Sequence, residues 1–463
     1  MSILHTDNKP MEKETFFTTD TSFYKSFFRM MIVVALQNLV AYSVNMADNI
    51  MLGSYDQNAL SGASTVNQIF FMVQQVALSV GNALVVLASQ YWGQKKTEPI
   101  RSLTGIALKL GAIFSIIIVS LCVLLPVPLL KLFTTSPEII AQGQEYLSII
   151  QWTFALFIIS NVLMAALRSA GTVNISFSIS VVSLLVNVGI NYVLIFGRFG
   201  FPEMGIKGAA IGTLIARILE LLIVVIYIAK FDKKLHLFSK GLFTPNTELR
   251  KDYTKVYIPI FCAQVLWGIS VPMQSAILGH LSDDAIAANS VATTFYQYLK
   301  VIVLGMSSTS AVMIGNAIGR GDIKRVKSDA RTMAVLDVCI GLVLGFVLFV
   351  LRGPLLSMYS LTDSAMVMAE HLIIIMSIIM VGMSYQMPVS FGLIQGGGDA
   401  QFTMRMNMIS TWLIVMPLSF AAAFWWKWPV ELVVLVIQSD QIFKGLPTFI
   451  HFRKYKWMKK LTK

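Results

Sequence analysis

One carboxylate lies inside an otherwise uncharged hydrophobic stretch near the start of the chain, and it is the strongest candidate for chemistry. No charged residue separates Arg29 from Asp48, and Gly53 ends the hydrophobic run five positions later. A charged side chain inside a membrane-spanning helix costs roughly 2.5–3.5 kcal/mol, so it normally faces protein or water and serves a transport pathway. Asp48 is therefore the leading candidate for a functional residue.

Three uncharged, oxygen-bearing side chains are expected at the same depth as Asp48. Asn191 comes six residues before the outer end of the fifth predicted span, and Thr213 lies about seven residues into the sixth. Asn187 is four residues before Asn191 and shares its helix face. Amide and hydroxyl oxygens beside a carboxylate can ligate Na⁺ or stabilise one protonation state of the acid. The alternative is that these residues only form hydrogen bonds between helices.

The other charged residues inside predicted spans divide by whether a partner lies within reach. Arg217 and Glu220 are three residues apart, and Asp440 and Lys444 are four apart, so each pair can form a local ion pair. We interpret these four residues as structural. Asp337 lies near the cytoplasmic end of its span, where it can pair with neighbours or reach the membrane surface.

Lys300 differs from these residues because no acid lies within one helical turn of it. It lies about fourteen residues into the eighth predicted span, and its counterpart in the internal repeat described below is Gln74. Two hypotheses remain open: Lys300 pairs with a distant carboxylate, or it binds anionic groups of a substrate. A purely structural contact is the alternative to both.

The composition indicates a membrane protein with many spans. Of the 463 residues, 56% are hydrophobic and only 13% are charged, whereas a soluble domain carries about 25% charged residues. Long apolar runs without two-residue alternation exclude a β-barrel, so the predicted fold class is all-α integral membrane protein. We predict twelve transmembrane helices of about 20 residues or more, at residues 30–52, 62–90, 102–126, 144–167, 173–197, 206–229, 256–279, 286–316, 330–351, 368–394, 404–426 and 430–450.

The positions of the basic residues predict the orientation of these spans. If the N-terminus is inside, most of the 36 Lys and Arg residues fall in inner tails and loops. This bias follows the positive-inside rule and places both termini in the cytoplasm. The formal net charge of +12 then reflects topology and contact with anionic membrane lipids, and no nucleic-acid partner is expected.

The two halves of the chain match each other at a fixed offset. A shift of 226 positions aligns Gly53 with Gly279 and Gly93 with Gly319. Such matches indicate two pseudo-symmetric six-helix bundles in parallel orientation, with a substrate cleft between them; chance matching of common residues is the alternative. The predicted organisation is a cytoplasmic tail (1–25), an N-lobe (26–229), a cytoplasmic linker (230–255), a C-lobe (256–450) and a basic cytoplasmic tail (451–463).

Several stretches resemble signatures of the multidrug and toxic compound extrusion (MATE) transporters. They are MADNIMLG at the end of the first span, NVGINYVLIFG at 187–197, GIKGAAIGT at 205–213, GHLSDDAIAANS at 279–290, QGGGDAQF at 395–402 and KGLPTFIHFRKYKWMKKL at 444–461. The resemblance depends on the order and spacing of these motifs together. It implies a V-shaped pair of six-helix bundles that exports organic molecules against an inward flow of protons or sodium ions.

The resemblance also implies roles for particular residues. Asp48, Asn187, Asn191 and Thr213 match the family's ion site in the N-lobe, where Na⁺ can contact the first three. Some members carry an acid at the position of Asn191, so this chain keeps a single carboxylate, which can serve either ion. An acid also often stands at the position of Gln264. The C-lobe is therefore expected to be less acidic than in relatives that take bulky organic cations.

From these observations we expect a secondary active antiporter of the bacterial cytoplasmic membrane. It would export small organic or drug-like molecules in exchange for H⁺ or Na⁺ by alternating access, as a monomer, with no cofactor besides the coupling ion. The alternative is a lipid-linked oligosaccharide or lipid flippase of the same wider superfamily, which should have a strongly cationic cavity. An enzyme is disfavoured, because the chain has no HExxH or GxSxG motif. The residues expected in the substrate cavity are Gln74, Gln264, Trp267, Tyr296, Tyr298 and Lys300.

Overall fold

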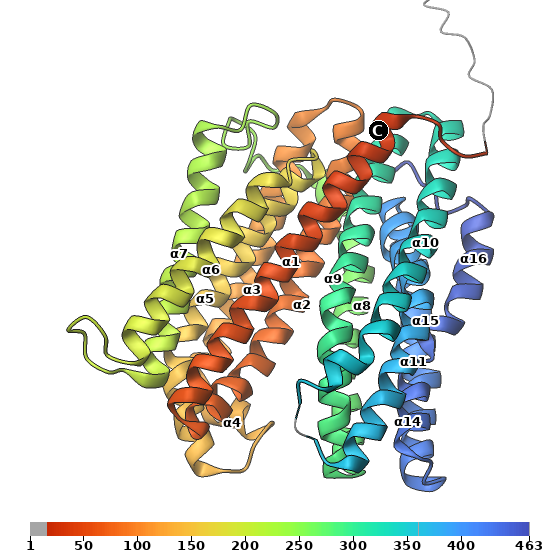
Figure 1. Ribbon diagram of the computed structural model, residues 1–463. Coiled ribbons are helices and arrows are strands. Elements are labelled where there is room, and N and C mark those ends of the chain that lie inside the picture. The colour runs from red at the N-terminus through yellow and green to blue at the C-terminus, as the bar shows by residue number, and fades with distance from the viewer. Residues whose placement is uncertain (1–15, 360, 463) are drawn as a thin grey trace, which may run out of the picture.

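The computed structural model describes residues 16–359 and 361–462, and this part of the chain is helical without any strand. Eleven helices among the described residues are long and apolar enough to cross a membrane. The helices form two bundles that stand side by side and separate toward one end, which gives the molecule a V shape (Figure 1). The loop 231–246 and the described chain ends lie at the other end, which we call the linker end (Figure 1).

The first bundle contains α1 to α7. Its helices begin where the sequence offers N-caps: Asp20, Asp56 and Ser136 each accept a hydrogen bond from a backbone N–H in the first turn of α1, α2 and α5. The bounds are α1 Thr21–Tyr55, α2 Gln57–Gly93, α3 Thr97–Leu124, α4 Pro126–Lys131, α5 Pro137–Ser169, α6 Asn174–Ile195 and α7 Gly205–Lys230.

The second bundle begins with α8, whose first turn is capped by Asn246. Residues 247–255, which the sequence placed in the linker, are therefore already helical. The bounds are α8 Thr247–Gly279, α9 Asp283–Arg320, α10 Ile323–Leu356, α11 Asp363–Met387, η1 Pro388–Ile394, α12 Ala400–Asn407, η2 Met408–Val415, α13 Met416–Phe420, η3 Ala421–Trp425, α14 Val430–Gln438, α15 Asp440–Phe443 and α16 Gly445–Arg453.

The last predicted span is present as an interrupted helix. Ser439 and Lys444 separate its three pieces, and both keep right-handed helical backbone angles. Polar residues, including Asp440 and Lys444, occupy the middle of this segment, and each of its three helical pieces is shorter than a membrane span. The expectation of an all-α membrane protein is confirmed, with eleven long helices among the described residues and a divided twelfth segment. The eleventh long helix runs without a break through α12, η2, α13 and η3.

Helix α1 belongs to both bundles. Its first half places Phe23, Phe27 and Met31 in a buried cluster with Ile314 of α9 and Met333 of α10. Its second half packs along α6 of the first bundle. A tilt of α1 across the molecule allows both contacts (Figure 1).

The two bundles meet closely at the linker end. Gly93 of α2 and Gly319 of α9 are equivalent positions of the internal repeat, and each lies against the backbone of the other helix. A Cβ atom at Gly93 would overlap the carbonyl oxygen of Asn316, and one at Gly319 would overlap that of Gln90. Only glycine permits this approach, so the cleft is closed at this end.

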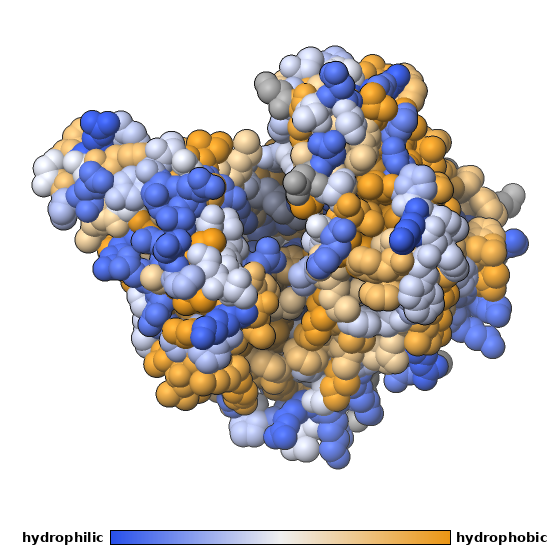
Figure 2. Space-filling view, turned by 90° about the horizontal axis from the view of Figure 1, so that it is seen from below, coloured by the Kyte–Doolittle hydropathy of each residue, from blue (hydrophilic) through white to orange (hydrophobic). Residues whose placement is uncertain are grey.

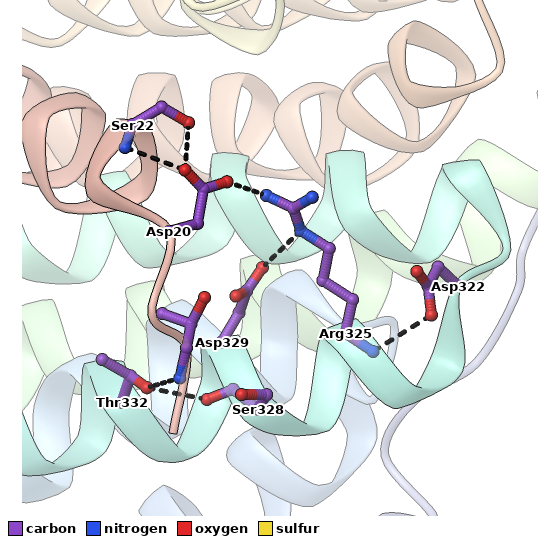
Figure 3. A network of polar contacts seen from close by, with 8 residues as sticks. Asp20, Ser22, Asp322, Arg325, Ser328, Asp329 and Thr332 are labelled. Atoms are coloured by element: carbon purple, nitrogen blue, oxygen red, sulfur yellow. Dashed lines mark hydrogen bonds and ion pairs between the residues drawn. The ribbon is translucent and has the colours of Figure 1, made fainter. Parts of the chain in front are cut away.

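The N-terminal segment is tied to α10 at the same end. Arg325 forms an ion pair with Asp20, and the backbone N–H of Thr18 donates to Oγ1 of Thr332 over 3.0 Å (Figure 3). The hydroxyl and the backbone N–H of Ser22 both donate to Asp20 and hold the pKa of that carboxyl below its ordinary value, with a smaller contribution from Arg325. We call Thr18, Asp20, Arg325 and Thr332 the N-terminal latch.

The C-terminal segment reaches the first bundle. Gln90 of α2 donates to the carbonyl of Lys459 over 3.1 Å and accepts from the backbone N–H of Leu461 over 2.8 Å. Trp457, two residues before Lys459, is fully buried in the cluster that also holds Phe27. This segment therefore connects the two bundles at the linker end.

Candidate functional site

The structure brings the four predicted ion-site residues together in the first bundle. Nδ2 of Asn191 donates to Oδ1 of Asp48 over 2.6 Å and also lies 3.4 Å from Oδ1 of Asn187. Nδ2 of Asn187 donates to Oγ1 of Thr213 over 3.1 Å. Asp48, Asn187 and Asn191 are buried, with exposed fractions of 7%, 1% and 0%. Helices α1, α6 and α7 thus contribute a continuous polar chain to an apolar bundle.

Small residues let α6 and α7 approach closely enough to form this chain. A Cβ atom at Gly212 of α7 would overlap Oδ1 of Asn191, and one at Gly208 would lie 2.7 Å from the backbone carbon of Leu194. Oδ1 of Asn191 is buried and has no hydrogen-bond partner among the described residues. An amide oxygen free to act as a ligand therefore lies beside the carboxylate of Asp48.

These groups can load and unload a cation. The site offers carboxylate, amide and hydroxyl oxygens, which are ligands suited to Na⁺, and its single acid can also carry a proton. Tyr146 of α5, which the sequence did not single out, is buried in the cluster that holds Leu52, one helical turn after Asp48 on α1. Asp48 forms no ion pair with arginine or lysine among the described residues, so no side-chain cation holds it permanently.

The second bundle contains a buried ion pair and an additional lysine. Nζ of Lys444 lies 2.6 Å from Oδ2 of Asp440 and 2.8 Å from Oδ1 of Asn407. Lys300 lies in electrostatic range of Asp440, and its Nζ lies 5.2 Å from the ring centroid of Trp267. Lys444 therefore neutralises Asp440, and Lys300 forms no ion pair among the described residues.

The other residues expected in the substrate cavity occupy different environments. Gln74, Gln264 and Trp267 are half-buried, and the Trp267 ring lies 5.9 Å from that of Phe71 in α2, at the boundary between the bundles. Tyr296 is buried in the core of the second bundle and its hydroxyl contacts Sδ of Met383. The hydroxyl of Tyr298 contacts Sδ of Met46 in α1 over 2.7 Å and so connects the bundles.

Asp337 does not reach a membrane surface or a partner, as its position near the end of a span had suggested. Its exposed fraction is 0%, and neither of its carboxylate oxygens has a hydrogen-bond partner among the described residues. Gly341, one turn farther along α10, packs against Ser384 of α11, so this face of α10 is turned inward. The prediction of pairing or snorkelling was wrong because it considered depth and not the rotation of the helix.

The surface between the bundles is hollowed at the end opposite the linker. Seen from that end, a groove separates the two halves, and much of its visible lining is hydrophobic (Figure 2). The same bundles are in close contact at the linker end through Gly93 and Gly319. The molecule is therefore open at one end and closed at the other.

Comparison with known proteins identifies relatives over nearly the whole chain. A family model described as MatE matches residues 34–193 and 258–421; the two stretches begin 224 residues apart (258 − 34), close to the predicted repeat offset. A probable multidrug resistance protein NorM of Thermotoga maritima is 24% identical over 425 residues, which cover 92% of this chain and 91% of the relative. A protein of the same description from Rhizobium meliloti is 27% identical over 395 residues, 83% of this chain and 84% of the relative.

Solved structures share the fold. A mutant of the Vibrio cholerae MATE transporter VcmN superimposes with a TM-score of 0.85 at 20% identity, over 95% of this chain and 98% of that chain. A MOP superfamily transporter from Pyrococcus furiosus, described as having a binding pocket of reverse polarity, has a TM-score of 0.84 at 17% identity, over 96% of this chain and 99% of that chain.

Proposed function

Because the chain belongs to the MatE family, whose relatives are transporters and not enzymes, we propose that it exports small organic molecules in exchange for H⁺ or Na⁺. The buried contact of Asn191 with Asp48 is the observation that carries this proposal. A carboxylate removed from water needs a compensating charge or several hydrogen bonds. Asp48 has an amide donor and a free amide oxygen beside it, and a coupling ion supplies the missing charge.

The proposed cycle uses the asymmetry of the cleft. The linker end is assigned to the cytoplasm by the positive-inside rule, so the present conformation opens outward. An ion that enters from outside loads Asp48 and favours release of the substrate. The transporter then closes outward, opens inward, and releases the ion. Coupling requires only that ion and substrate stabilise different states of the two bundles. One chain supplies both bundles, so a monomer in the bacterial cytoplasmic membrane is the proposed transport unit.

The proposed substrates are flat organic molecules that carry an anionic or zwitterionic group. The description of the NorM relatives as multidrug resistance proteins supports organic substrates. The ammonium group of Lys300, which has no ion-pair partner among the described residues, supports a substrate carboxylate, and Trp267 beside it provides an aromatic face. The reverse polarity described for the Pyrococcus furiosus transporter is a precedent within the same fold.

Proteoliposomes with separately imposed proton and sodium gradients test the proposal. The wild-type protein should export a fluorescent organic substrate when one of the two gradients is applied, and that gradient identifies the coupling ion. Asp48→Asn should abolish this export without changing thermal unfolding in detergent. Asp56→Asn is a matched control, since Asp56 caps α2 at the surface and Asn caps helices equally well. Full gradient-driven export by Asp48→Asn would refute the proposed role of Asp48.

A further inference from the structure

The ion pair of Arg217 and Glu220 lies one helical turn from the Asp48 site. Both residues are on α7, where Nη1 of Arg217 lies 2.7 Å from Oε2 of Glu220. Thr213, which completes the polar chain from Asp48, precedes Arg217 by four residues and therefore shares its helix face. Arg217 also lies in electrostatic range of Asp48. A pair interpreted as structural from its spacing is thus next to the ion site.

A small cavity connects the pair with the site. It has a volume of about 50 Å³ and is lined by residues of α1, α6 and α7. A cavity of roughly 10–15 Å³ is enough to hold one water molecule, so this one has space for water and for movement of a guanidinium group. The lining residues that matter here are Asn187, Thr213, Arg217 and Glu220.

The charges around this cavity do not balance. The titratable groups that face it or lie beside it are Asp48 from α1, Tyr146 from α5, and Arg217 and Glu220 from α7. Two carboxylates and one guanidinium leave a single negative charge, because a tyrosine hydroxyl is neutral. One monovalent cation restores neutrality, and it can be a proton or Na⁺. When that cation leaves, Arg217 is the only positive group among these four residues.

Glu220 has a second polar partner on another helix, whereas the remaining contacts of Arg217 are with aromatic rings. Glu220 is 5% exposed, and it also accepts a hydrogen bond from Ser160 of α5 over 2.8 Å. The Arg217 side chain is 21% exposed, and its guanidinium lies over the faces of Phe157 and Phe70, 4.9 and 5.9 Å from the ring centroids. Contacts with a ring face constrain direction less than hydrogen bonds do, so they permit a guanidinium to slide.

We propose that Arg217 exchanges partners during transport, pairing with Glu220 while Asp48 carries the coupling ion and turning toward Asp48 when the ion leaves. Arg217 then competes with the ion for Asp48 and promotes its release. Glu220 has the opposite effect, because it draws Arg217 away and keeps Asp48 available for loading. Arg217 and Glu220 are positioning residues in this scheme, and the inference depends on the proposed function of Asp48.

The two members of the pair should therefore change ion dependence in opposite directions. Arg217→Gln removes the competitor, so the half-saturating ion concentration for export should fall by about tenfold and the maximal rate should also fall. Glu220→Gln releases Arg217 to Asp48, so the half-saturating concentration should rise by about tenfold. Arg217→Lys keeps the charge and should restore ion dependence toward that of the wild type. The measurement is substrate export against external NaCl, with choline chloride as replacement, or against external pH.

If the pair of Arg217 and Glu220 were only structural, the variants would behave differently. Loss of either partner would then impair folding in the same way and would shift ion dependence in one direction or not at all, and either result would overturn the proposal. Arg352→Gln and Glu370→Gln form a control pair, since these residues make a surface ion pair between α10 and α11 at 3.1 Å. Coupled export by Asp48→Asn would contradict the proposed function itself. If Asp48→Asn is uncoupled but the opposite shifts are missing, only the exchange of partners fails.

Discussion

Nδ2 of Asn191 lies 2.6 Å from Oδ1 of Asp48, although the two residues are 143 positions apart in the chain. The contact holds α6 against α1 at the level of the ion site. It also fixes Asn191 so that its other amide atom, Oδ1, faces the backbone of Gly212. In the proposed function, loading of Asp48 is therefore linked to the packing of three helices, and a substitution at Gly212 of α7 can test this link.

Gly212→Ala should weaken ion loading without removing any ligand. The new methyl group would overlap Oδ1 of Asn191 and displace its amide from Asp48. Loss of a hydrogen bond to a charged group costs roughly 1.5–3 kcal/mol, so the half-saturating ion concentration should rise by about tenfold or more. Ion-dependent export in proteoliposomes measures this shift. Gly189→Ala is the control, because a Cβ atom at that glycine of α6 meets no atom within 4 Å; equal ion dependence in the two variants would contradict the argument.

The grouping of the candidate ion-site residues could largely be predicted from the sequence, because depth along a helix follows from residue counting. Asp48, Asn191 and Thr213 were expected at one level, and the structure joins them. Helix rotation does not follow from counting. The proximity of Arg217 to Asp48 and the burial of Asp337 depend on it, and both were missed.

The fold was predictable to a similar extent. Hydropathy locates long apolar helices, and the repeat offset indicates two equivalent bundles. The interruption at Ser439 and Lys444 was not foreseen, because residue spacing predicts the local pair of Asp440 and Lys444 but not the hydrogen bond from Lys444 to Asn407 of another helix. The contact of Tyr296 with Met383 likewise depends on which face of α9 points to the core.

Lys300→Gln should reduce affinity for substrates that carry a carboxylate. The variant removes the ammonium group beside Trp267, and a charge-assisted hydrogen bond contributes roughly 1.5–3 kcal/mol. The apparent Kd of an anionic aromatic dye should rise by about tenfold or more, whereas that of a neutral analogue should change little. Fluorescence titration of the purified protein measures both. Lys300→Arg retains the charge and serves as the control; unchanged binding of the anionic dye to Lys300→Gln would exclude this residue from substrate recognition.

Arg325→Ala should favour opening at the linker end, since Arg325 is the cationic member of the N-terminal latch. An exposed ion pair contributes about 0.2–1 kcal/mol, so the population open at this end should increase by a few-fold at most. Distances between spin labels on α2 and α9 at the linker end measure this population. Lys324→Ala removes an exposed positive charge from the same turn of α10 and should have no effect.

The latch should also respond to acid in a defined direction. The pKa of Asp20 is lowered in the folded protein, so its contribution to stability is fully present above the unfolded pKa and is lost as the pH falls through the folded value. In the wild-type protein, the distances between the spin labels on α2 and α9 should therefore shift toward those of the open population only at acidic pH. The shift is expected at a pH near or below the ordinary pKa of a carboxyl group. A shift near neutral pH that Arg325→Ala abolishes would contradict this assignment.

Asp337→Leu should stabilise the protein, whereas Asp440→Leu should destabilise it. Asp337 is fully buried without a hydrogen-bond partner among the described residues, so its carboxyl group is desolvated without compensation. An apolar side chain of similar size removes that cost, and the unfolding temperature in detergent should rise. Asp440 has a partner at 2.6 Å, and its removal leaves Lys444 buried and unpaired, which costs about 3–5 kcal/mol. A lower unfolding temperature for Asp337→Leu would show that the carboxyl makes a favourable interaction of its own, because burial without compensation can only oppose folding.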